Sequence, residues 1–276
     1  MSAAPLRAGV IGWPVEHSKS PRLHTLWLER YGIDGSYVHL PTPPGELAAR
    51  MRSLVAEGWR GANVTIPHKE EALALADAAT DRARAIGAAN TLILRDGDVL
   101  ADNTDGFGFV ENLKDRLGAA WSPEAPALVL GAGGAARAVV WSLLDEGAVE
   151  VRLANRTRAR AEALAEAFGP RVRVVNWSDA EAALPGAGLI VNTTSLGMAG
   201  GPPLTVDLTR ADDAAAATDI VYVPLRTPFL EAAAARGLAC ADGLGMLLHQ
   251  ARPGFEAWFG RAPEVDEELR ALMLTP

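Results

Sequence analysis

Residues 128–137 read Leu-Val-Leu-Gly-Ala-Gly-Gly-Ala-Ala-Arg, and this stretch decides the fold class. A short apolar run leads into a tight glycine turn, and the turn leads into residues that favour a helix. Glycines let the backbone approach the phosphates of a dinucleotide, and the free amides of the following helix supply partial positive charge. Ala136 takes the third position of the usual spacing, which is a tolerated variant. The residues expected at the cofactor here are Gly131, Ala132, Gly133, Gly134 and Ala135.

The sequence after this stretch alternates between short apolar runs and helical segments. Strands are expected over residues 127–130, 150–154, 172–176, 189–192, 218–223 and 238–241. Helices are expected over residues 135–146, 159–168, 179–184, 212–217 and 229–236. Strict alternation of this kind predicts a Rossmann-type, doubly wound parallel sheet that is covered on both faces.

The residues before it predict a separate mixed α/β domain, so the fold class is α/β with two domains. Strands are expected over 6–11, 36–40 and 61–66, with a hairpin of 90–95 and 99–102 that turns at Asp96-Gly97-Asp98. Helices are expected over 21–31 with Ser20 as N-cap, 43–57, 69–79, 81–86 and 106–117. We expect a substrate-binding domain over 1–105 and a dinucleotide-binding domain over 106–242, with 106–120 as the connecting helix. Helices over 243–276 are expected to return to the first domain.

Composition excludes several classes of protein. The 276 residues carry a formal net charge of −8, and no basic stripe is present that could neutralise nucleic-acid phosphates. A single cysteine, Cys240, forms neither an intrachain disulfide nor a cysteine-based zinc site, so no metal is expected. No apolar run reaches the ~18 residues of a membrane span, and the first residues lack a signal-peptide pattern. We expect a cytoplasmic protein with no membrane or nucleic-acid partner.

The choice of dinucleotide depends on residues 155–160, which read Asn-Arg-Thr-Arg-Ala-Arg. At the end of the second strand, a protein selective for NAD usually carries an acid for the ribose hydroxyls, and none is present here. Arg156 and Arg160 are positioned to bind a 2′-phosphate, and Arg156 can also stack on the adenine. Because cations at a helix N-terminus oppose the macrodipole, an anion is expected beside them. The pattern favours NADP, with Asn155, Arg156, Thr157, Arg158, Ala159 and Arg160 as its candidate ligands.

Three polar clusters in the first domain are candidates for a substrate site: residues 17–21, 63–69, and 90–91 together with 102–106. Each member has a purely structural alternative, such as a helix cap for Ser20 or Asp105 and a solvated helix position for Lys69. Together they supply hydroxyls and amides for a polyol, one titratable amine and one carboxylate.

These motifs resemble the shikimate dehydrogenase family over nearly the whole chain. The matching stretches are Gly12–Pro21, Asn63–Lys69, Ala89–Thr91, Asp102–Gly106, Gly131–Ala135, Asn155–Arg160, Asn192–Met198 and Gly243–Gln250. The resemblance implies reversible NADP-dependent reduction of 3-dehydroshikimate to shikimate, a step of aromatic amino-acid biosynthesis. The resemblance does not determine the oligomeric state, and we expect a monomer or a homodimer.

The resemblance also implies roles for individual residues. Ser18 and Ser20 resemble the hydroxyls that bind the substrate carboxylate, and Tyr222 resembles a tyrosine near it, with a packed strand aromatic as the alternative. The residues implied to contact ring hydroxyls are Thr65, Asn90, Asp105 and Gln250. Ile220 and Gly243 resemble positions whose backbone contacts the nicotinamide.

Lys69 resembles the catalytic lysine of the family. With Asp105 it would transfer the proton at the C3 oxygen while the nicotinamide delivers hydride to the same carbon. Lys69 would act as the proton donor or as an orienting charge, and either role requires a cation close to the developing alkoxide.

Three alternatives stay open at this point. A quinate/shikimate dehydrogenase has broader substrate use and often prefers NAD, against which Arg156 and Arg160 argue. A methylenetetrahydrofolate dehydrogenase shares the two-domain architecture but not the motif at 63–69. A catalytically silent NADP-binding sensor would not need Lys69 and Asp105.

Overall fold

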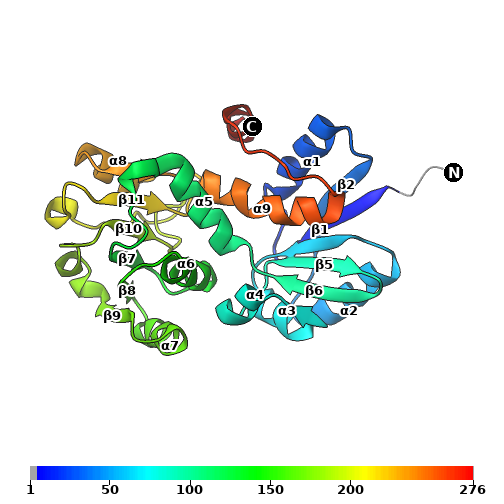
Figure 1. Cartoon of the computed structure of the whole chain (residues 1–276), viewed down its shortest axis with the longest axis horizontal. Helices are drawn as coiled ribbons and strands as arrows, with labels where there is room; N and C mark the ends of the chain where they lie inside the picture. The colour runs from blue at the N-terminus through cyan, green and yellow to red at the C-terminus, as the bar shows by residue number, and fades with distance from the viewer. Residues whose placement is uncertain (1–4, 276) are drawn as a thin grey trace. The chain divides into compact units, whose positions relative to one another are not determined.

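The computed structural model describes residues 5–275 and divides the chain into two compact units. The first unit comprises the residues up to Asp105 together with those from Leu247 on, and the second comprises Gly106–Met246. The expected α/β class with two units is confirmed (Figure 1). Within residues 5–275, no helix has both the length and the apolar character that crossing a membrane requires.

The first unit is built on a six-stranded mixed sheet with the order β2-β1-β3-β5-β6-β4. Its strands are β1 Leu6–Gly12, β2 Gly35–Pro41, β3 Gly61–Val64, β4 Ala78–Ala79, β5 Thr91–Arg95 and β6 Asp98–Asp102. β1 pairs in parallel with β2 and β3, whereas β5 pairs antiparallel with β3 and β6. Asp96 and Gly97 have φ of 56° and 94°, and this left-handed backbone forms the tight turn between β5 and β6.

Helices cover both faces of this sheet. They are α1 Ser20–Tyr31, α2 Leu47–Ala56, α3 Lys69–Leu75, α4 Asp81–Ile86, α9 Leu244–Phe259 and α10 Glu267–Leu274. Leu47 and Met51 of α2 pack into one apolar core with Leu92 of the sheet. On the other face, α1 and α9, together with Tyr37 of β2, form an aromatic cluster whose members are His24, Trp27, Tyr31, Tyr37, Phe255, Trp258 and Phe259.

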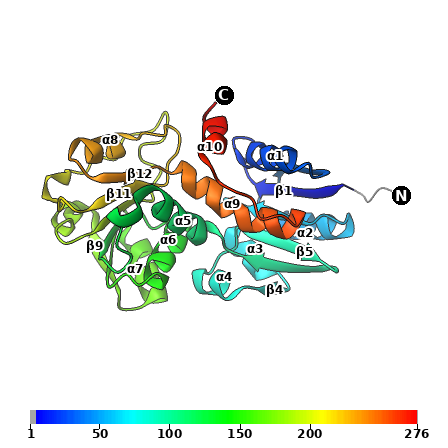
Figure 2. The same cartoon turned by 45° about the horizontal axis from the view of Figure 1, so that its top comes forward.

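The C-terminal helices are therefore an integral part of the first unit. The indole of Trp258 on α9 donates to the carbonyl of Leu92 on β5 at 2.9 Å. α10 lies beside α1, where Arg30 forms ion pairs of 2.9 and 3.0 Å with Asp266 and Glu268 (Figure 2).

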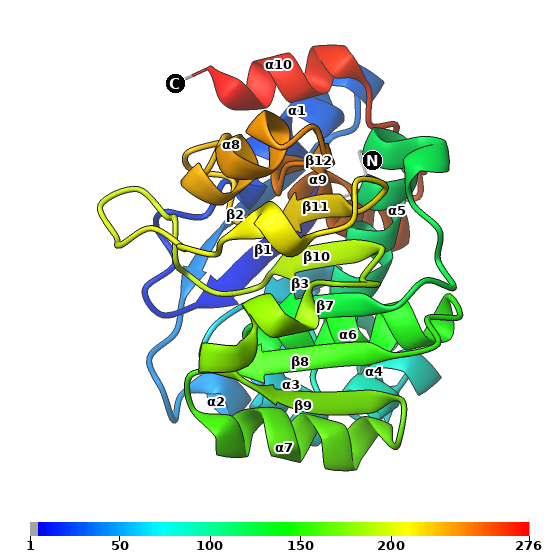
Figure 3. The same cartoon turned by 90° about the vertical axis from the view of Figure 1, so that its left-hand side faces the viewer.

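The second unit contains a fully parallel sheet with the order β12-β11-β10-β7-β8-β9 (Figure 3). Its strands are β7 Ala127–Leu130, β8 Val151–Asn155, β9 Val172–Asn176, β10 Leu189–Asn192, β11 Ala216–Asp219 and β12 Ala239–Ala241. The strand order reverses direction between β7 and β10. In open α/β sheets, ligands bind outside the carboxyl ends of the strands at such a reversal.

Two apolar cores cover the two faces of this sheet. The helices are α5 Asp105–Leu117, α6 Gly134–Asp145, α7 Arg158–Phe168 and α8 Pro228–Ala235, with short 3₁₀ turns at Gly118–Ala120, Trp177–Asp179, Glu181–Ala183 and Leu208–Arg210. Successive strand residues point to opposite faces, so Val129 belongs to the core with α5 and α6 while Leu128 belongs to the core with α8.

Several expected boundaries in the first unit are wrong. Ser20 is not the N-cap of α1: the helix begins at Ser20, Lys19 precedes it, and the carbonyl of Lys19 accepts the first helical hydrogen bond from Leu23. The helix expected from residue 43 begins only at Leu47, because the chain turns at Gly45, whose φ of 87° is not helical. The helix expected over 69–79 ends at Leu75, and Ala78 and Ala79 form β4 instead.

Corrections in the second unit concern short elements. The alanine-rich run 212–217 is not a helix, because Ala216 and Ala217 are buried in β11 between β10 and β12. The strand expected over 218–223 stops at Asp219, where the carboxylate of Asp219 accepts the amide of Val221 and ends the strand. Tyr222 therefore lies after the strand and not within it. The helix expected over 179–184 is replaced by 3₁₀ turns.

Candidate active site

An amine and a carboxylate meet in the first unit. Lys69 is the first residue of α3, and Asp105 is the first residue of α5, which begins three residues after β6 ends. Lys69 Nζ lies 2.5 Å from Asp105 Oδ2, and the two side chains are 19% and 10% exposed. The pair is thus partly shielded from water but still accessible, as proton transfer to a bound molecule requires.

Asn90 and Gln250 complete the surroundings of this carboxylate. Asn90 Nδ2 donates to Asp105 Oδ1 at 2.8 Å and to Gln250 Oε1 at 3.2 Å. Gln250 lies on α9, and its own amide donates to the carbonyl of Leu247 at 3.0 Å. The fold thus brings together four of the predicted residues from α3, α5, α9 and the segment before β5.

Ser18, Ser20 and Thr65 lie at the carboxyl ends of β1 and β3, which are parallel neighbours. The hydroxyl of Ser18 accepts the backbone amide of Ser20 at 3.3 Å. Thr65 donates its backbone amide to Ile11 at 2.8 Å, and its hydroxyl makes no hydrogen bond within residues 5–275. These three hydroxyls therefore have hydrogen-bonding capacity left for a polar ligand.

Sequence reasoning missed the buried support behind these groups. Tyr37 on β2 donates its hydroxyl to Asn63 Oδ1 at 2.6 Å, and Asn63 donates to the carbonyl of Asn90 at 3.1 Å. Burial raises the pKa of Tyr37 well above its ordinary value, although hydrogen bonding with Ser20 acts the other way. The signal in the sequence was the alternating pattern of β2, which places Tyr37 on the buried face. A buried tyrosine needs a hydrogen-bond partner for its hydroxyl.

A second missed support holds the strand end before Asp105. Asp102 accepts hydrogen bonds of 2.7 Å from Thr80 Oγ1, from Arg82 Nε and from the amide of Asn103. Burial acts to raise the pKa of Asp102, but the hydrogen bonds from Arg82 and Thr80 outweigh it and lower that pKa. Asn103 Oδ1 in turn accepts the amide of Asp105 at 3.1 Å, so the Arg82 ion pair helps to position Asp105.

The glycine turn after β7 has the geometry that a pyrophosphate needs. Gly131 has a φ of 113°, and a Cβ on it would lie 2.5 Å from Thr193 Oγ1, so only glycine fits there. At Gly133 and Gly134 no atom would lie within 4 Å of a Cβ, so a ligand can approach the backbone closely. α6 begins at Gly134 with no side-chain cap and no acid in its first turn, which leaves its first amides free for an anion. Ala132 and Ala135 complete this turn.

The arginine cluster after β8 divides into paired and unpaired cations. Arg158 is held by Glu162 at 2.7 Å and by Asn176 at 2.6 Å. Arg156 and Arg160 are exposed, and their guanidinium groups have no hydrogen-bonding or ionic partner in the described part of the chain. They are therefore the two cations free to bind a phosphate.

Asn155, Thr157 and Ala159 are the other residues predicted in this cluster. Asn155 Oδ1 accepts the amide of Ala132 at 3.1 Å, and its Nδ2 donates to the carbonyl of Thr157 at 2.8 Å. Asn155 thus ties the glycine turn to the arginine cluster. Thr157 is the residue before α7, and Ala159 is exposed in its first turn.

The remaining predicted residues lie after β11 in the second unit. The amide of Ile220 donates to the carbonyl of Asn192 at 3.1 Å, and a Cβ on Gly243 would lie 2.5 Å from the carbonyl oxygen of Ile220. These two backbones are therefore in direct contact. Tyr222 is half-buried, and burial raises the pKa of its hydroxyl.

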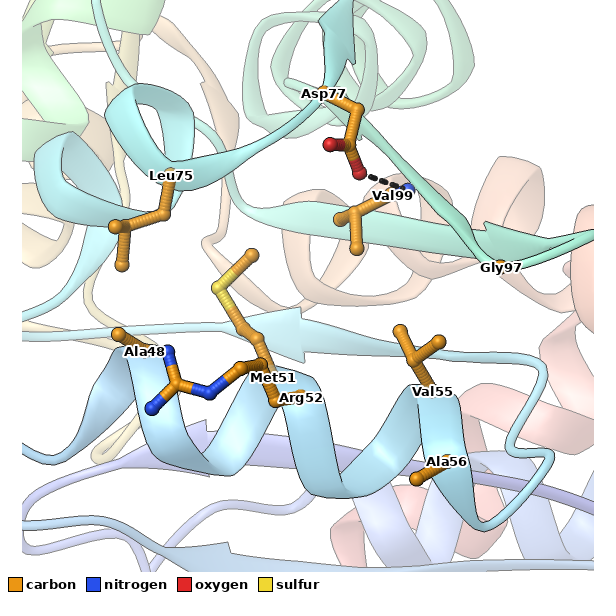
Figure 4. A pocket seen from close by; sticks show the side chains of 9 residues that line it. All are labelled: Ala48, Met51, Arg52, Val55, Ala56, Leu75, Asp77, Gly97 and Val99. Atoms are coloured by element: carbon orange, nitrogen blue, oxygen red, sulfur yellow. Dashed lines mark hydrogen bonds between the residues drawn. The ribbon is translucent and has the colours of Figure 1, made fainter.

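A hollow of about 350 Å³ in the first unit is separate from these residues (Figure 4). Met51 and Val55 of α2 face Leu75 and Val99 across it, and Asp77 accepts the amide of Val99 at 2.8 Å. None of the predicted site residues lines this hollow. Within residues 5–275, no group of three or more histidine, cysteine, aspartate or glutamate side chains is arranged to hold a metal ion.

Family profiles match three stretches of the chain. The profile of the shikimate dehydrogenase substrate binding domain matches residues 10–92, that of shikimate / quinate 5-dehydrogenase matches 116–198, and that of the shikimate 5′-dehydrogenase C-terminal domain matches 243–273. Shikimate dehydrogenase (NADP(+)) of Paracoccus denitrificans is 59% identical over 273 residues, which cover 98% of this chain and 96% of the relative. The enzyme of the same name from Rhodospirillum rubrum is 58% identical, over 97% of this chain and 96% of the relative.

Solved structures show the same fold. Shikimate 5-dehydrogenase of Thermus thermophilus, in complex with NADP(H) and shikimate, is 40% identical and superposes with a TM-score of 0.85 over 97% of both chains. Quinate dehydrogenase of Corynebacterium glutamicum, in complex with NAD, is 28% identical with a TM-score of 0.91 over 98% of this chain and 99% of that one.

Proposed function

The chain belongs to the shikimate dehydrogenase family, and from this membership we infer that it catalyses the reversible NADPH-dependent reduction of 3-dehydroshikimate to shikimate. This reaction is a step of aromatic amino-acid biosynthesis. The observation in the structure that carries the proposal is the Lys69–Asp105 pair, held at 2.5 Å among amide and hydroxyl groups suited to a polyol.

We assign substrate binding to the first unit and to Tyr222. Ser18 and Ser20 would hold the carboxylate, to which their hydroxyls can donate, and Tyr222 would lie near it. The groups assigned to the ring hydroxyls are those of Thr65, Asn90, Asp105 and Gln250. Supporting this assignment, Asn90 already donates to both Asp105 and Gln250, so all three side chains are oriented before substrate binds.

Lys69 acts on the C3 oxygen. In the reduction, negative charge develops on this oxygen, and the ammonium of Lys69 stabilises it and donates a proton toward it. Asp105 accepts hydrogen bonds from both Lys69 and Asn90, so its carboxylate fixes where the ammonium points. In the oxidation, the same amine receives the proton from the C3 hydroxyl.

The second unit would hold NADP. The open backbone at Gly133 and Gly134 and the uncapped start of α6 fit a pyrophosphate, and the unpaired Arg156 and Arg160 fit a 2′-phosphate. The cofactor, when bound, supplies the hydride. Ile220 and Gly243 would present backbone to its nicotinamide, and Asn155 braces the turn that cradles its phosphates.

A quinate dehydrogenase that uses NAD is the second candidate, favoured by the likeness to the Corynebacterium glutamicum enzyme. The free arginines favour NADP instead. Initial rates with shikimate or quinate, each with NADP⁺ and NAD⁺, distinguish the two: we expect shikimate with NADP⁺ to have the highest kcat/KM. Highest efficiency with quinate and NAD⁺ would reverse the assignment, and no turnover with any pair would indicate a silent sensor. We further propose that the enzyme works in the cytoplasm, as a monomer or a homodimer.

A further inference from the structure

Asp219, the last residue of β11, is a buried carboxylate that no step above uses. It is 1% exposed and accepts three hydrogen bonds. Oδ1 accepts Asn192 Nδ2 at 3.0 Å and the amide of Val221 at 2.9 Å, and Oδ2 accepts Thr227 Oγ1 at 2.7 Å. Burial raises the pKa of Asp219, while these three donors act in the opposite direction. The carboxylate therefore holds both ends of residues 220–227.

Asn192, the last residue of β10, does the same for the neighbouring segment. It is fully buried and lies opposite Asp219 in the register of β10 and β11. Its Oδ1 accepts Thr194 Oγ1 at 2.7 Å and the amide of Thr194 at 3.0 Å, and its Nδ2 also donates to the carbonyl of Leu196 at 3.0 Å. The Asn192–Asp219 hydrogen bond thus joins two loops, residues 193–198 and 220–227.

Both loops leave the carboxyl edge of the sheet at its topological reversal (Figure 3). The glycine turn follows β7 and Arg156 follows β8, so the phosphates and the adenosine half belong on that side of the reversal. The two loops follow β10 and β11 on the other side, which leaves them the nicotinamide half. Thr193 lies close to Gly131, so the first loop packs directly against the glycine turn.

We propose that Asn192 and Asp219 are a positioning pair, which sets the backbone of the two loops where the nicotinamide half of NADP binds. This rests on the proposed function for the identity of the cofactor. Neither side chain needs to touch the cofactor, because both act through the backbone of Val221, Thr194 and Leu196. The adenosine half, held by separate residues, does not depend on the pair.

Two ligands test this separation: NADP⁺ and its fragment adenosine 2′,5′-diphosphate, which lacks the nicotinamide half. In Asp219→Ala, calorimetry should find fragment affinity within twofold of wild type, whereas the Kd for NADP⁺ should rise about tenfold. kcat for shikimate oxidation should fall by about 10- to 100-fold, since displaced reacting atoms lower the rate steeply.

Asp219→Asn keeps one acceptor oxygen for Asn192 and Val221 and places an amide NH2 group toward Thr227, so it should show the same pattern with smaller losses. It also serves if the alanine variant does not fold. Asp207→Ala is the matched control, because Asp207 caps a 3₁₀ turn of the same unit through the amide of Thr209 at 2.9 Å. This control should retain wild-type affinities and rates.

Equal losses of fragment and NADP⁺ affinity would overturn the proposal, because Asp219 would then support the unit as a whole. Unchanged NADP⁺ affinity and kcat in Asp219→Ala would also overturn it. Failure of the proposed function looks different: wild type itself would then not oxidise shikimate with NADP⁺. The comparison of the two ligands by calorimetry needs no substrate, so its outcome does not depend on whether the enzyme oxidises shikimate.

Discussion

His24 offers a quantitative test of how the first unit is stabilised. This residue of α1 is fully buried in the aromatic cluster, where its ring stacks on Tyr37 at 3.9 Å. Neither ring nitrogen has a hydrogen-bond partner within the described chain. Burial alone lowers the pKa of His24 from 6.5 to about 3. The imidazole therefore stays neutral in the folded protein at pH values where the unfolded chain binds a proton.

The sign and size of the effect follow from this difference in pKa. Above pH 6.5 the imidazole is neutral in both states, so protonation costs no stability. As the pH falls from 6.5 toward 3, the unfolded state alone gains a proton, and the free energy of unfolding declines by ~1.4 kcal/mol per pH unit. At pH 4.5 this loss amounts to ~3 kcal/mol, and at pH 3, where the folded imidazole is itself half protonated, to ~4 kcal/mol.

His24→Phe removes the titrating group and keeps an aromatic ring against Tyr37. We expect the variant to be at least as stable as wild type at pH 7.5, because two unpartnered polar atoms leave the core. At pH 4.5 its advantage over wild type should be larger by ~3 kcal/mol. Urea unfolding followed by tryptophan fluorescence gives the free energy of unfolding of both proteins. The difference between variant and wild type is then compared at the two pH values.

His17→Gln, which removes an exposed histidine, is the control and should keep the pH dependence of wild type. An advantage of His24→Phe that is the same at both pH values, within ~0.5 kcal/mol, would refute the reasoning, since buried neutral His24 would then contribute nothing to the acid sensitivity. Shikimate oxidation at pH 7.5 should be unchanged, because the ring acts only behind Tyr37.

Three further predictions concern the proposed site. Lys69→Ala should lower kcat by about 10² to 10⁴ with little change in shikimate binding, and a variant that retains more than a tenth of wild-type kcat would exclude the assigned role. Ser18→Ala/Ser20→Ala should chiefly raise the KM for shikimate, at ~1.5 to 3 kcal/mol for each lost bond to a carboxylate, and calorimetry should find NADP⁺ binding intact. Arg156→Ala/Arg160→Ala should lower kcat/KM for NADP⁺ by ~10² or more and leave NAD⁺ unaffected; equal losses for both cofactors at two salt concentrations would place the phosphate site elsewhere.

The parallel sheet was predictable because its signal is local. β7 and β8 are short apolar runs that each lead into a helix, and the glycine turn marks the first of them. β11 was not predictable in the same way. Ala216 and Ala217 carry high helix propensity, and only burial between β10 and β12 makes them a strand. The helix expected over the residues of β4 was wrong for a similar reason, because these two alanines become a strand only through pairing with β6.

The candidate site shows a comparable division. Residue types and order were sufficient to nominate Lys69 and Asp105, which the fold brings together. Their buried supports were not nominated, because Tyr37 and Arg82 act across distances that only the folded chain sets. The sequence already singled out Arg156 and Arg160 for a 2′-phosphate, and the fold adds a reason for leaving out Arg158, whose guanidinium is bound by Glu162 and Asn176.

Asn90 shows how these supports determine what the site can recognise. Its Oδ1 accepts Thr91 Oγ1 at 3.0 Å, the amide of Thr104 at 2.8 Å and Thr104 Oγ1 at 3.1 Å. The backbone amide of Thr104 can only donate, so it fixes which end of the Asn90 side chain is oxygen. The Nδ2 group must then point to Asp105 and Gln250. Both Nδ2 hydrogens are then in use, so a ring hydroxyl that binds at Asn90 has to take over one of them from Asp105 or Gln250.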